Sequence, residues 1–236
     1  MGKKLPTTFA VDPDIDMTSL AELNPDLIVA PQSGITPAQY KTLSALAPTV
    51  AYPGGAWQTT WDDQISILGK AVGKPKKAES LIAGITSDLA AVKKANPEFS
   101  KYTFAYVSIG NPGTLSVYLK GDPRVALLSA MGLTESKELV GITPPKGSYI
   151  GTIGLEKSNL LDSSDLLFTW YYDAKNQKQV NSQPLVASIP AIKRGSVVSS
   201  YDEQFVMGST FITPLSVPWV IDRYVPMIKK AAEKVG

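Results

Sequence analysis

Two segments of this chain share one pattern that constrains the fold more than any other feature. The first, at 17–30, reads MTSLAELNPDLIVA, and the second, at 155–168, reads LEKSNLLDSSDLLF. In each, apolar residues at helical spacing lead into a polar turn, an Asp and a continuous apolar run typical of a buried parallel strand. The repeated unit predicts two similar α/β lobes, and a cleft between two such lobes is a common place for a ligand.

Composition excludes several classes of function. The 236 residues are 44% hydrophobic and 19% charged, which is typical of a globular protein with a proper core. The formal net charge of +2 is too small to indicate nucleic acid or an anionic membrane as a partner. The chain has no Cys and no His, so disulfides, thiolate sites, most zinc sites and most hydrolase triads are excluded. A metal site made of carboxylates or Tyr alone stays open, and no metal ligand is assigned.

The sequence shows no targeting or membrane-spanning segment. It lacks the run of about eighteen apolar residues that a membrane-spanning helix needs. The basic start at 1–4 is too short for a signal peptide, and no apolar segment follows it. We therefore expect either a cytoplasmic protein or an exported one whose signal is not part of this chain.

Helix caps and short apolar runs predict the elements of the first part of the chain. Thr36 followed by Pro37 is typical of a helix start, since Thr caps and Pro suits the first helical position. Thr60 or Asp62 caps a further expected helix, which ends at Gly73. The expected strands lie at 7–11, 26–30 and 49–52, and the other expected helix at 17–23.

A longer helical pattern runs from Pro75 to about 95, with its apolar residues on one stripe. A helix of this length spans roughly 30 Å, enough to join two lobes as a rigid rod. We therefore expect an N-terminal lobe at 1–74, a linker helix at 75–96 and a C-terminal lobe at 97–236, whose last helix returns toward the first lobe.

The second part of the chain shows the same alternation of strands and helices. An aromatic loop is expected at 170–173, an irregular segment at 134–153 and a long loop after 199. The expected strands lie at 102–107, 114–118, 165–170 and 196–199, and the expected helices at 123–131, 155–161, 184–190 and 218–234.

Three motifs, taken in order, resemble one family. Residues 23–29, LNPDLIV, resemble the Leu-x-Pro-Asp-Leu-Ile/Val signature of iron-siderophore and vitamin B12 binding proteins of bacterial ABC importers. Residues 67–73, ILGKAVG, resemble the approach to that family's backbone helix, and 122–132, DPRVALLSAMG, resemble the start of its second lobe. The resemblance covers nearly the whole chain.

The resemblance implies a fold and a function. The fold is α/β, with two lobes of mainly parallel sheets joined by one long helix, as in class III periplasmic binding proteins. The function is extracytoplasmic binding of a ferric siderophore and its delivery to an ABC permease, with no catalysis and no resident cofactor. The family is exported, often with a lipid anchor on an N-terminal Cys, and docks to the permease through one Glu on each lobe.

This chain departs from the family at its start. It begins where the family is already inside its first lobe, so we expect a truncated first lobe without the lipid-anchor Cys. The first docking Glu falls at Thr18, with Asp16 and Glu22 nearby, and the second falls on Glu156. An uncovered edge of the first sheet would favour pairing with a second copy, so a homo-oligomer is also expected.

Candidate ligand contacts lie in loops that follow the expected strands, where ligands meet parallel α/β sheets. Trp57 either faces a ligand or packs onto the following helix, whereas Trp61 is expected in the core. Tyr171 and Tyr172 are neighbours at a strand end, so one is expected to face the ligand and the other the core. The loop candidates are Gln32, Ser33, Trp57, Ser108, Asn111, Tyr171 and Tyr172.

Charged candidates have two interpretations each. Arg124 either pairs with an acid at the surface or faces an anionic ferric chelate, a role that suits Arg. Tyr118 and Lys120 lie in the same segment and share that second role. Glu156 is either a first-turn acid favoured by the helix dipole or, by the resemblance, the permease-docking residue.

Three other functions stay open. The chain has no phosphate-binding loop and no Gly-x-Ser-x-Gly nucleophile elbow, so the sequence gives little support for an enzyme. A corrinoid or haem binder on the same scaffold is the first alternative, although haem ligation would need Tyr or Met. An oligomerising or scaffold protein is the second alternative, and a small-molecule hydrolase is the third.

Overall fold

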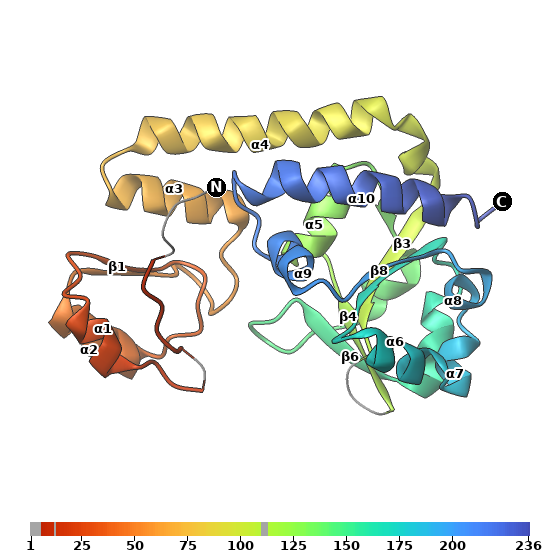
Figure 1. Cartoon of the computed structure of the whole chain (residues 1–236), viewed down its shortest axis with the longest axis horizontal. Helices are drawn as coiled ribbons and strands as arrows, with labels where there is room; N and C mark the ends of the chain where they lie inside the picture. Colours follow the sequence, from red (N-terminus) through yellow and green to blue (C-terminus); the bar gives the residue numbers. More distant parts are fainter. Residues whose placement is uncertain (1–5, 12, 110–112) are drawn as a thin grey trace. The chain divides into compact units, whose positions relative to one another are not determined.

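The computed structural model describes residues 6–11, 13–109 and 113–236, and its chain divides into two compact units. The first ends at Thr59 and the second runs from Thr60 to Gly236. Helix α3 (Trp61–Ala71) packs along α4 (Pro75–Ala95) in the second unit (Figure 1). The compact units therefore divide before α3, whereas the expected lobe boundary lies at 74. The assignment of the lobes stays a prediction, as does the return of the last helix toward the first lobe.

The first unit holds two short parallel strands and two helices. Strand β1 (Ile28–Ala30) pairs with β2 (Thr49–Ala51), with Val29 opposite Val50. Helix α1 (Met17–Glu22) precedes β1 and is capped by the carboxylate of Asp16. Helix α2 (Pro37–Leu46) connects the two strands, as parallel pairing requires.

Local sequence signals explain both helix starts. The Asp16 carboxylate accepts a hydrogen bond from the backbone of Ser19, which also keeps the pKa of that carboxyl below its usual value. Thr36 and Gln39 form a reciprocal capping box ahead of Pro37, as the Thr-Pro pair predicted.

The prediction of a strand at 7–11 is wrong. Residues 6–11 form no strand, and the carbonyl of Ala10 instead accepts a hydrogen bond from the backbone N–H of Asp16. The segment turns toward the start of α1, so its β-like composition does not lead to strand pairing.

The second unit is built on a mixed sheet. Its strand order is β6-β4-β3-β7-β8, with β5 paired to β3. Strand β3 pairs in parallel with β5 and β7, and β8 pairs in parallel with β7, whereas β4 is antiparallel to both β3 and β6. The expected parallel pairing thus holds for three of these five pairs of strands. The sheet is mixed because the short link between β3 and β4 allows only a hairpin. The strands are β3 (Thr103–Ser108), β4 (Thr114–Tyr118), β5 (Thr134–Glu135), β6 (Ile150–Gly154), β7 (Leu166–Trp170) and β8 (Val197–Ser200).

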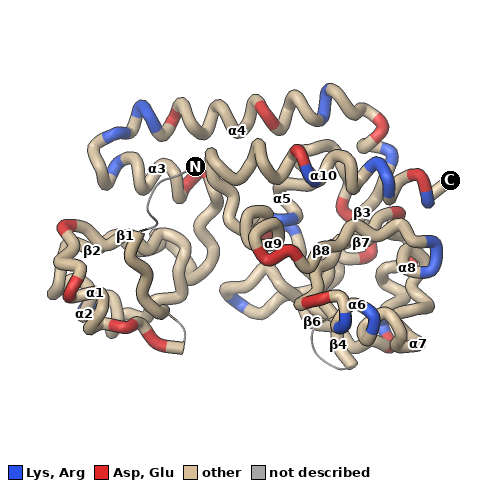
Figure 2. Tube along the Cα trace, viewed as in Figure 1, with Lys and Arg blue, Asp and Glu red and all other residues tan. Residues whose placement is uncertain are grey.

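Helices cover both faces of this sheet (Figure 1). The expected long helix is confirmed as α4, which has 21 residues and Lys residues near both of its ends (Figure 2). The others are η1 (Pro97–Lys101), α5 (Pro123–Ala130), η2 (Lys137–Gly141), η3 (Leu155–Leu161), α6 (Ala174–Asn181), α7 (Pro184–Ala187), α8 (Pro190–Arg194), α9 (Glu203–Thr210) and α10 (Ser216–Ala232).

Three elements differ from the sequence-based expectation. Strand β6 lies in the segment expected to be irregular, because its pairing with β4 is tertiary and leaves no local apolar pattern. Helix α9 lies in the long loop that was expected after 199, and helix α6 lies in a segment for which no element was expected. Asp173 caps α6 and Asp202 caps α9.

The core has one layer on each face of the sheet, because neighbouring strand residues point to opposite sides. Phe104, Tyr106 and Phe168 pack with residues of α4, α5, α9 and α10. Ala105 and Leu167 pack on the other face with residues of η3, α7 and α8.

The repeat that was predicted at 17–30 and 155–168 is present in both units. In the first unit it forms α1 and β1, and in the second it forms η3 and β7. Each copy ends in a strand with a parallel neighbour, as the Asp-led apolar runs predicted. The second helix is a 3₁₀ helix rather than an α-helix.

The two units differ in how much buried structure supports their strands. Leu20, Leu43 and Ala47 are the buried hydrophobic side chains in the described part of the first unit, whereas β3 and β7 are buried along nearly their whole length. We expect backbone amides of β1 and β2 to exchange at least about tenfold faster than those of β3 and β7. Hydrogen–deuterium exchange with mass spectrometry measures this, and equal protection in both units would contradict it.

Candidate functional site

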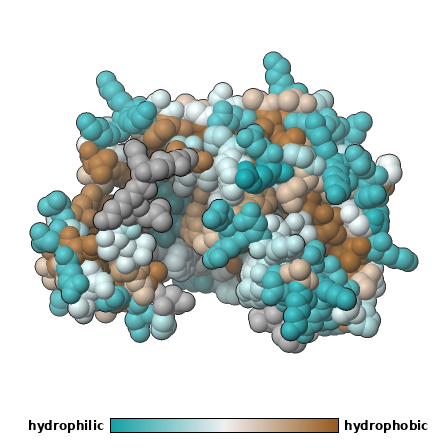
Figure 3. Space-filling model, in the orientation of Figure 1, coloured by the Kyte–Doolittle hydropathy of each residue, from teal (hydrophilic) through white to brown (hydrophobic). Residues whose placement is uncertain are grey.

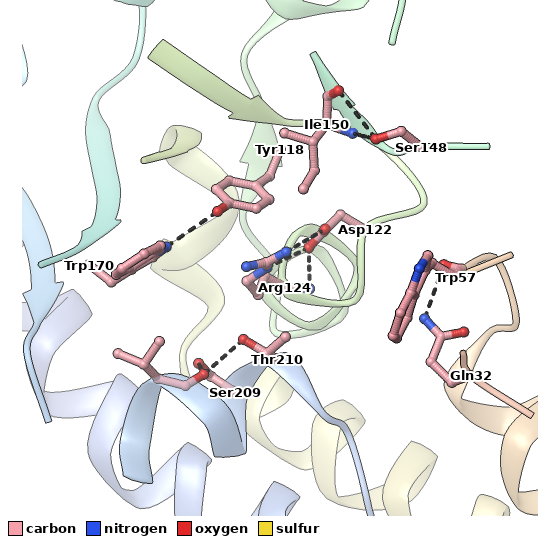
Figure 4. Close-up of polar contacts among 11 residues, drawn as sticks. Gln32, Trp57, Tyr118, Asp122, Arg124, Ser148, Ile150, Trp170, Ser209 and Thr210 are labelled. Atoms are coloured by element: carbon pink, nitrogen blue, oxygen red, sulfur yellow. Dashed lines mark hydrogen bonds and ion pairs between the residues drawn. The ribbon is translucent and has the colours of Figure 1, made fainter. Parts of the chain in front are cut away.

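In the first unit, the loop after β1 and the loop after β2 are joined by one side chain. The amide of Gln32 donates from Nε2 to the carbonyl of Trp57 at 3.0 Å and accepts at Oε1 from the N–H of Thr59 at 3.0 Å (Figure 4). The N–H of Trp57 donates to the carbonyl of Ser33 at 3.0 Å. These bonds hold Trp57 in a left-handed conformation with φ +61°, which a non-glycine residue rarely adopts.

The ring of Trp57 is 56% exposed and lies against the backbone at Gly34. A Cβ on Gly34 would lie 2.3 Å from the indole Nε1, so a glycine is needed for this close approach. Trp57, Gln32 and Ser33 line a cavity of about 460 Å³ whose other walls are largely apolar. Trp61, in contrast, packs against the core of the second unit, as expected.

In the second unit, the start of α5 places Arg124 beside Asp122. The guanidinium donates from Nε to Oδ1 and from Nη2 to Oδ2, each at 2.8 Å (Figure 4). Asp122 is also the N-cap of α5 and accepts from the backbone N–H of Arg124 at 3.0 Å. Both side chains are nearly buried, at 12% and 5% exposure. The structure thus shows the expected pairing with an acid, but nearly buried rather than at the surface, and contact of Arg124 with a ferric chelate stays a prediction.

Two buried aromatic rings pack against this ion pair, and Tyr118 and Tyr106 are 5% and 3% exposed. The guanidinium carbon of Arg124 is 3.8 Å from the centroid of the Tyr118 ring and 5.7 Å from that of Tyr106. The indole of Trp170 donates to the hydroxyl of Tyr118 at 3.3 Å. Burial opposes the charge of Arg124, but the bonds to Asp122 outweigh it and raise the pKa of the guanidinium. Arg124 is therefore a fixed cation with a fixed counter-charge.

The two tyrosines after β7 point in opposite directions, as expected. Tyr171 is 4% exposed, packs in the core and donates to Asn181 at 2.8 Å. Tyr172 is 69% exposed and meets the ring of Trp170 edge-on at 5.2 Å. The structure thus removes Tyr171 from the surface that a ligand could touch, and burial raises the pKa of its phenol.

The remaining candidates are spread over the second unit. Ser108 is buried at the end of β3, and Lys120 is exposed after β4. Glu156 is exposed in the first turn of η3, next to Leu155, whose N–H donates to the carbonyl of Gly113. Asn111 lies outside the described residues.

Three residues of the site were not singled out from the sequence. Trp170 was named only as part of an aromatic loop, although it donates to Tyr118. Asp122 was noted as a helix start, and its spacing of two residues before Arg124 is the signal that could have indicated the ion pair. Tyr106 was missed because its contact with Arg124 depends on the pairing of β3 with β4.

The described residues contain neither a helix able to cross a membrane nor a cluster able to hold a metal ion. None of the helices in 6–11, 13–109 and 113–236 combines the length and apolar character needed to cross a membrane. In the same residues, no three acidic, His or Cys side chains gather where they could hold a metal ion. On the face viewed in Figure 3, hydrophilic side chains are interspersed with apolar areas.

Comparison with known families decides the relationship. The periplasmic binding protein family matches residues 5–203, which is most of the chain. The chain belongs to this family. The ferric enterobactin-binding periplasmic protein FepB of Escherichia coli is 26% identical over 211 residues, covering 86% of this chain. The chain spans 64% of the length of FepB, which is less than two thirds.

Solved structures of the family show the same fold. PiaA of Streptococcus pneumoniae, solved in complex with ferrichrome, is 29% identical with a TM-score of 0.82, covering 94% of this chain and 74% of PiaA. A periplasmic solute-binding protein of Mycobacterium smegmatis is 26% identical with a TM-score of 0.82, covering 100% of this chain and 78% of that protein. The α/β class III architecture that the motifs implied is therefore confirmed.

The contact between Gly34 and Trp57 generates a prediction. We expect Gly34→Ala to displace the indole of Trp57, because the new methyl group would overlap it. The loss in free energy of unfolding should be below the ~1–3 kcal/mol of overpacking a core, since the exposed ring is free to move toward solvent. Near-ultraviolet circular dichroism and tryptophan emission report the displacement. Gly54→Ala is the matched control, because a Cβ on Gly54 meets nothing within 4 Å. Identical spectra for the two variants would contradict the contact.

Proposed function

We propose that this chain binds a ferric siderophore outside the cytoplasm and delivers it to the permease of a bacterial ABC importer, without catalysing a reaction. Membership of the periplasmic binding protein family supports a binding role. FepB is a ferric enterobactin-binding protein, and PiaA is solved with ferrichrome, so siderophore binding is the function that these relatives support.

The observation that carries the proposal is the aromatic surface around Arg124. A siderophore already satisfies the iron, so a binding protein meets only the organic outer surface of the chelate. The rings of Trp170 and Tyr172 supply contact area at low entropic cost, and the N–H groups of Arg124 that do not bind Asp122 supply hydrogen bonds. Tyr118, which is 5% exposed, supports the guanidinium from beneath. This combination suits a bulky, rigid ligand with oxygen atoms at its surface.

The proposed contacts in the first unit are Trp57, Gln32 and Ser33. Trp57 offers an exposed ring beside the cavity, and Gln32 holds the backbone that presents this ring. In this proposal Gln32 acts as a positioning residue, because both ends of its amide are already bonded to the loop.

The proposal is tested by titrating the chain with ferric chelates while tryptophan fluorescence is recorded. Quenching that saturates with ferrichrome or ferric enterobactin, and not with the iron-free ligands, would support it. Haem and a corrinoid are the comparison ligands, since a binder of either on the same scaffold is the alternative. Saturable binding of one of these, with none of a ferric siderophore, would overturn the proposal.

Trp57→Ala should weaken binding of the ferric siderophore by about 1–3 kcal/mol, the scale for losing contact with a large aromatic ring. Trp57→Phe should retain most of the affinity, because it keeps an aromatic face at the same place. Isothermal titration calorimetry measures both variants after their folds have been checked by circular dichroism. Unchanged affinity in a folded Trp57→Ala protein would show that the ring only packs on its own loop.

Glu156 is the proposed docking residue for the permease. We expect Glu156→Gln to leave siderophore affinity unchanged and to reduce stimulation of the permease ATPase several-fold, because docking loses one charged contact. Glu98→Gln is the matched control, since Glu98 also lies in the first turn of a 3₁₀ helix, which is η1 before β3 rather than η3. Equal stimulation by the two variants would contradict the docking role.

A further inference from the structure

The charge of Arg124 is already balanced within the protein. Nε and Nη2 both donate to the carboxylate of Asp122, which is 5% exposed. The backbone N–H of Arg124 holds the same carboxylate at 3.0 Å. A ligand that reaches Arg124 therefore meets a bonded pair with no net charge.

Besides Asp122, the side chains described in contact with the guanidinium are aromatic. Tyr106 and Tyr118 lie beneath the guanidinium, and Trp170 donates to Tyr118. Helix α5 packs against α9, and Figure 4 shows Ser209 and Thr210 of α9 on the side that faces Arg124. Burial raises the pKa of Tyr106, so its phenol stays neutral.

The nearest cation in the sequence is also engaged elsewhere. Lys120 is exposed, and its electrostatic partner is the carboxylate of Glu135. Within the described part of the second unit, the charged group that acts on Arg124 is Asp122.

The pair still offers hydrogen bonds. A guanidinium has five N–H groups, and two of these bind Asp122, which leaves three as donors. These donors suit oxygen atoms of a neutral chelate. An anionic chelate would lose its hydration here and would face the carboxylate of Asp122 without gaining an unpaired cation.

From this arrangement we infer that the Arg124 surface selects ferric chelates without net charge over anionic ones. The inference rests on the proposed function and refines it by naming the class of chelate. It revises the expectation that Arg124 serves an anionic chelate, because sequence did not reveal that Asp122 neutralises it. The specificity has two sources: an anion gains no unpaired cation at the site, and a neutral ligand gains hydrogen bonds from Arg124.

Two known chelates separate these classes. Ferrichrome is a ferric hydroxamate in which the ligand charges balance the iron, and ferric enterobactin is a catecholate with a net negative charge. We expect the unaltered chain to bind ferrichrome at least about 100-fold more tightly. We also expect its affinity for ferrichrome to change less than about twofold between about 0.01 M and about 0.15 M salt, over which the Debye length falls from about 30 Å to about 8 Å.

Each outcome of this titration has one meaning. Tighter binding of ferric enterobactin, weakened by salt, would overturn the inference and leave the proposed function standing. Failure to bind either chelate would overturn the proposed function itself.

A variant tests the role of Asp122 directly. Asp122→Asn keeps a capping side chain at the start of α5 but leaves the charge of Arg124 unbalanced. We expect the ratio of affinities to shift about tenfold toward ferric enterobactin. Asp162→Asn is the control, because it changes the net charge of the chain by the same amount. Asp162 is exposed and precedes the start of β7, whereas Trp170 lies at the end of that strand. An equal shift in both variants, or none in Asp122→Asn, would overturn the inference.

Discussion

The second unit depends on the ion pair between Arg124 and Asp122 and on the tyrosine ring beneath it. Asp122 caps α5, neutralises Arg124 and fixes the guanidinium 3.8 Å from the centroid of Tyr118. Removing one partner of such a pair leaves a nearly buried charge without compensation, which typically costs about 3–5 kcal/mol. Asp122 thus links the start of a helix, the packing of β4 and the position of the guanidinium of Arg124.

The layer below the pair connects this surface to the sheet. Tyr106 packs edge-on against Tyr118 and stacks near Phe168, which in turn meets Tyr224 of α10. Burial raises the pKa of both Tyr106 and Tyr224, so the layer stays neutral over the physiological range. Rigid aromatic packing holds the guanidinium of Arg124 in place, and in the proposed function this pre-organisation reduces the entropic cost of binding a ligand.

Local signals in the sequence predicted local structure well. Thr36, Pro37 and Pro75 begin helices where their capping and φ preferences indicate, and the Asp-led apolar runs became β1 and β7. Strand β6 and the hairpin sense of β4 were not predicted, because they depend on pairing between distant segments. The same limit applies to the site. Alternation separated Tyr171 from Tyr172, but the bonds of Gln32 to residues 57 and 59 and the placement of Tyr106 beneath Arg124 are set by tertiary contacts that no local pattern encodes.

The central claim is that the Arg124 surface is where this chain of the periplasmic binding protein family holds its ligand. A crystal structure of the chain with ferrichrome tests it most directly. The predicted result places the chelate against the rings of Trp170 and Tyr172, within hydrogen-bond distance of the N–H groups of Arg124 that do not bind Asp122, with both bonds to Asp122 intact. A chelate that makes no contact with Arg124, or a guanidinium that has left Asp122 to pair with the ligand, would contradict the claim.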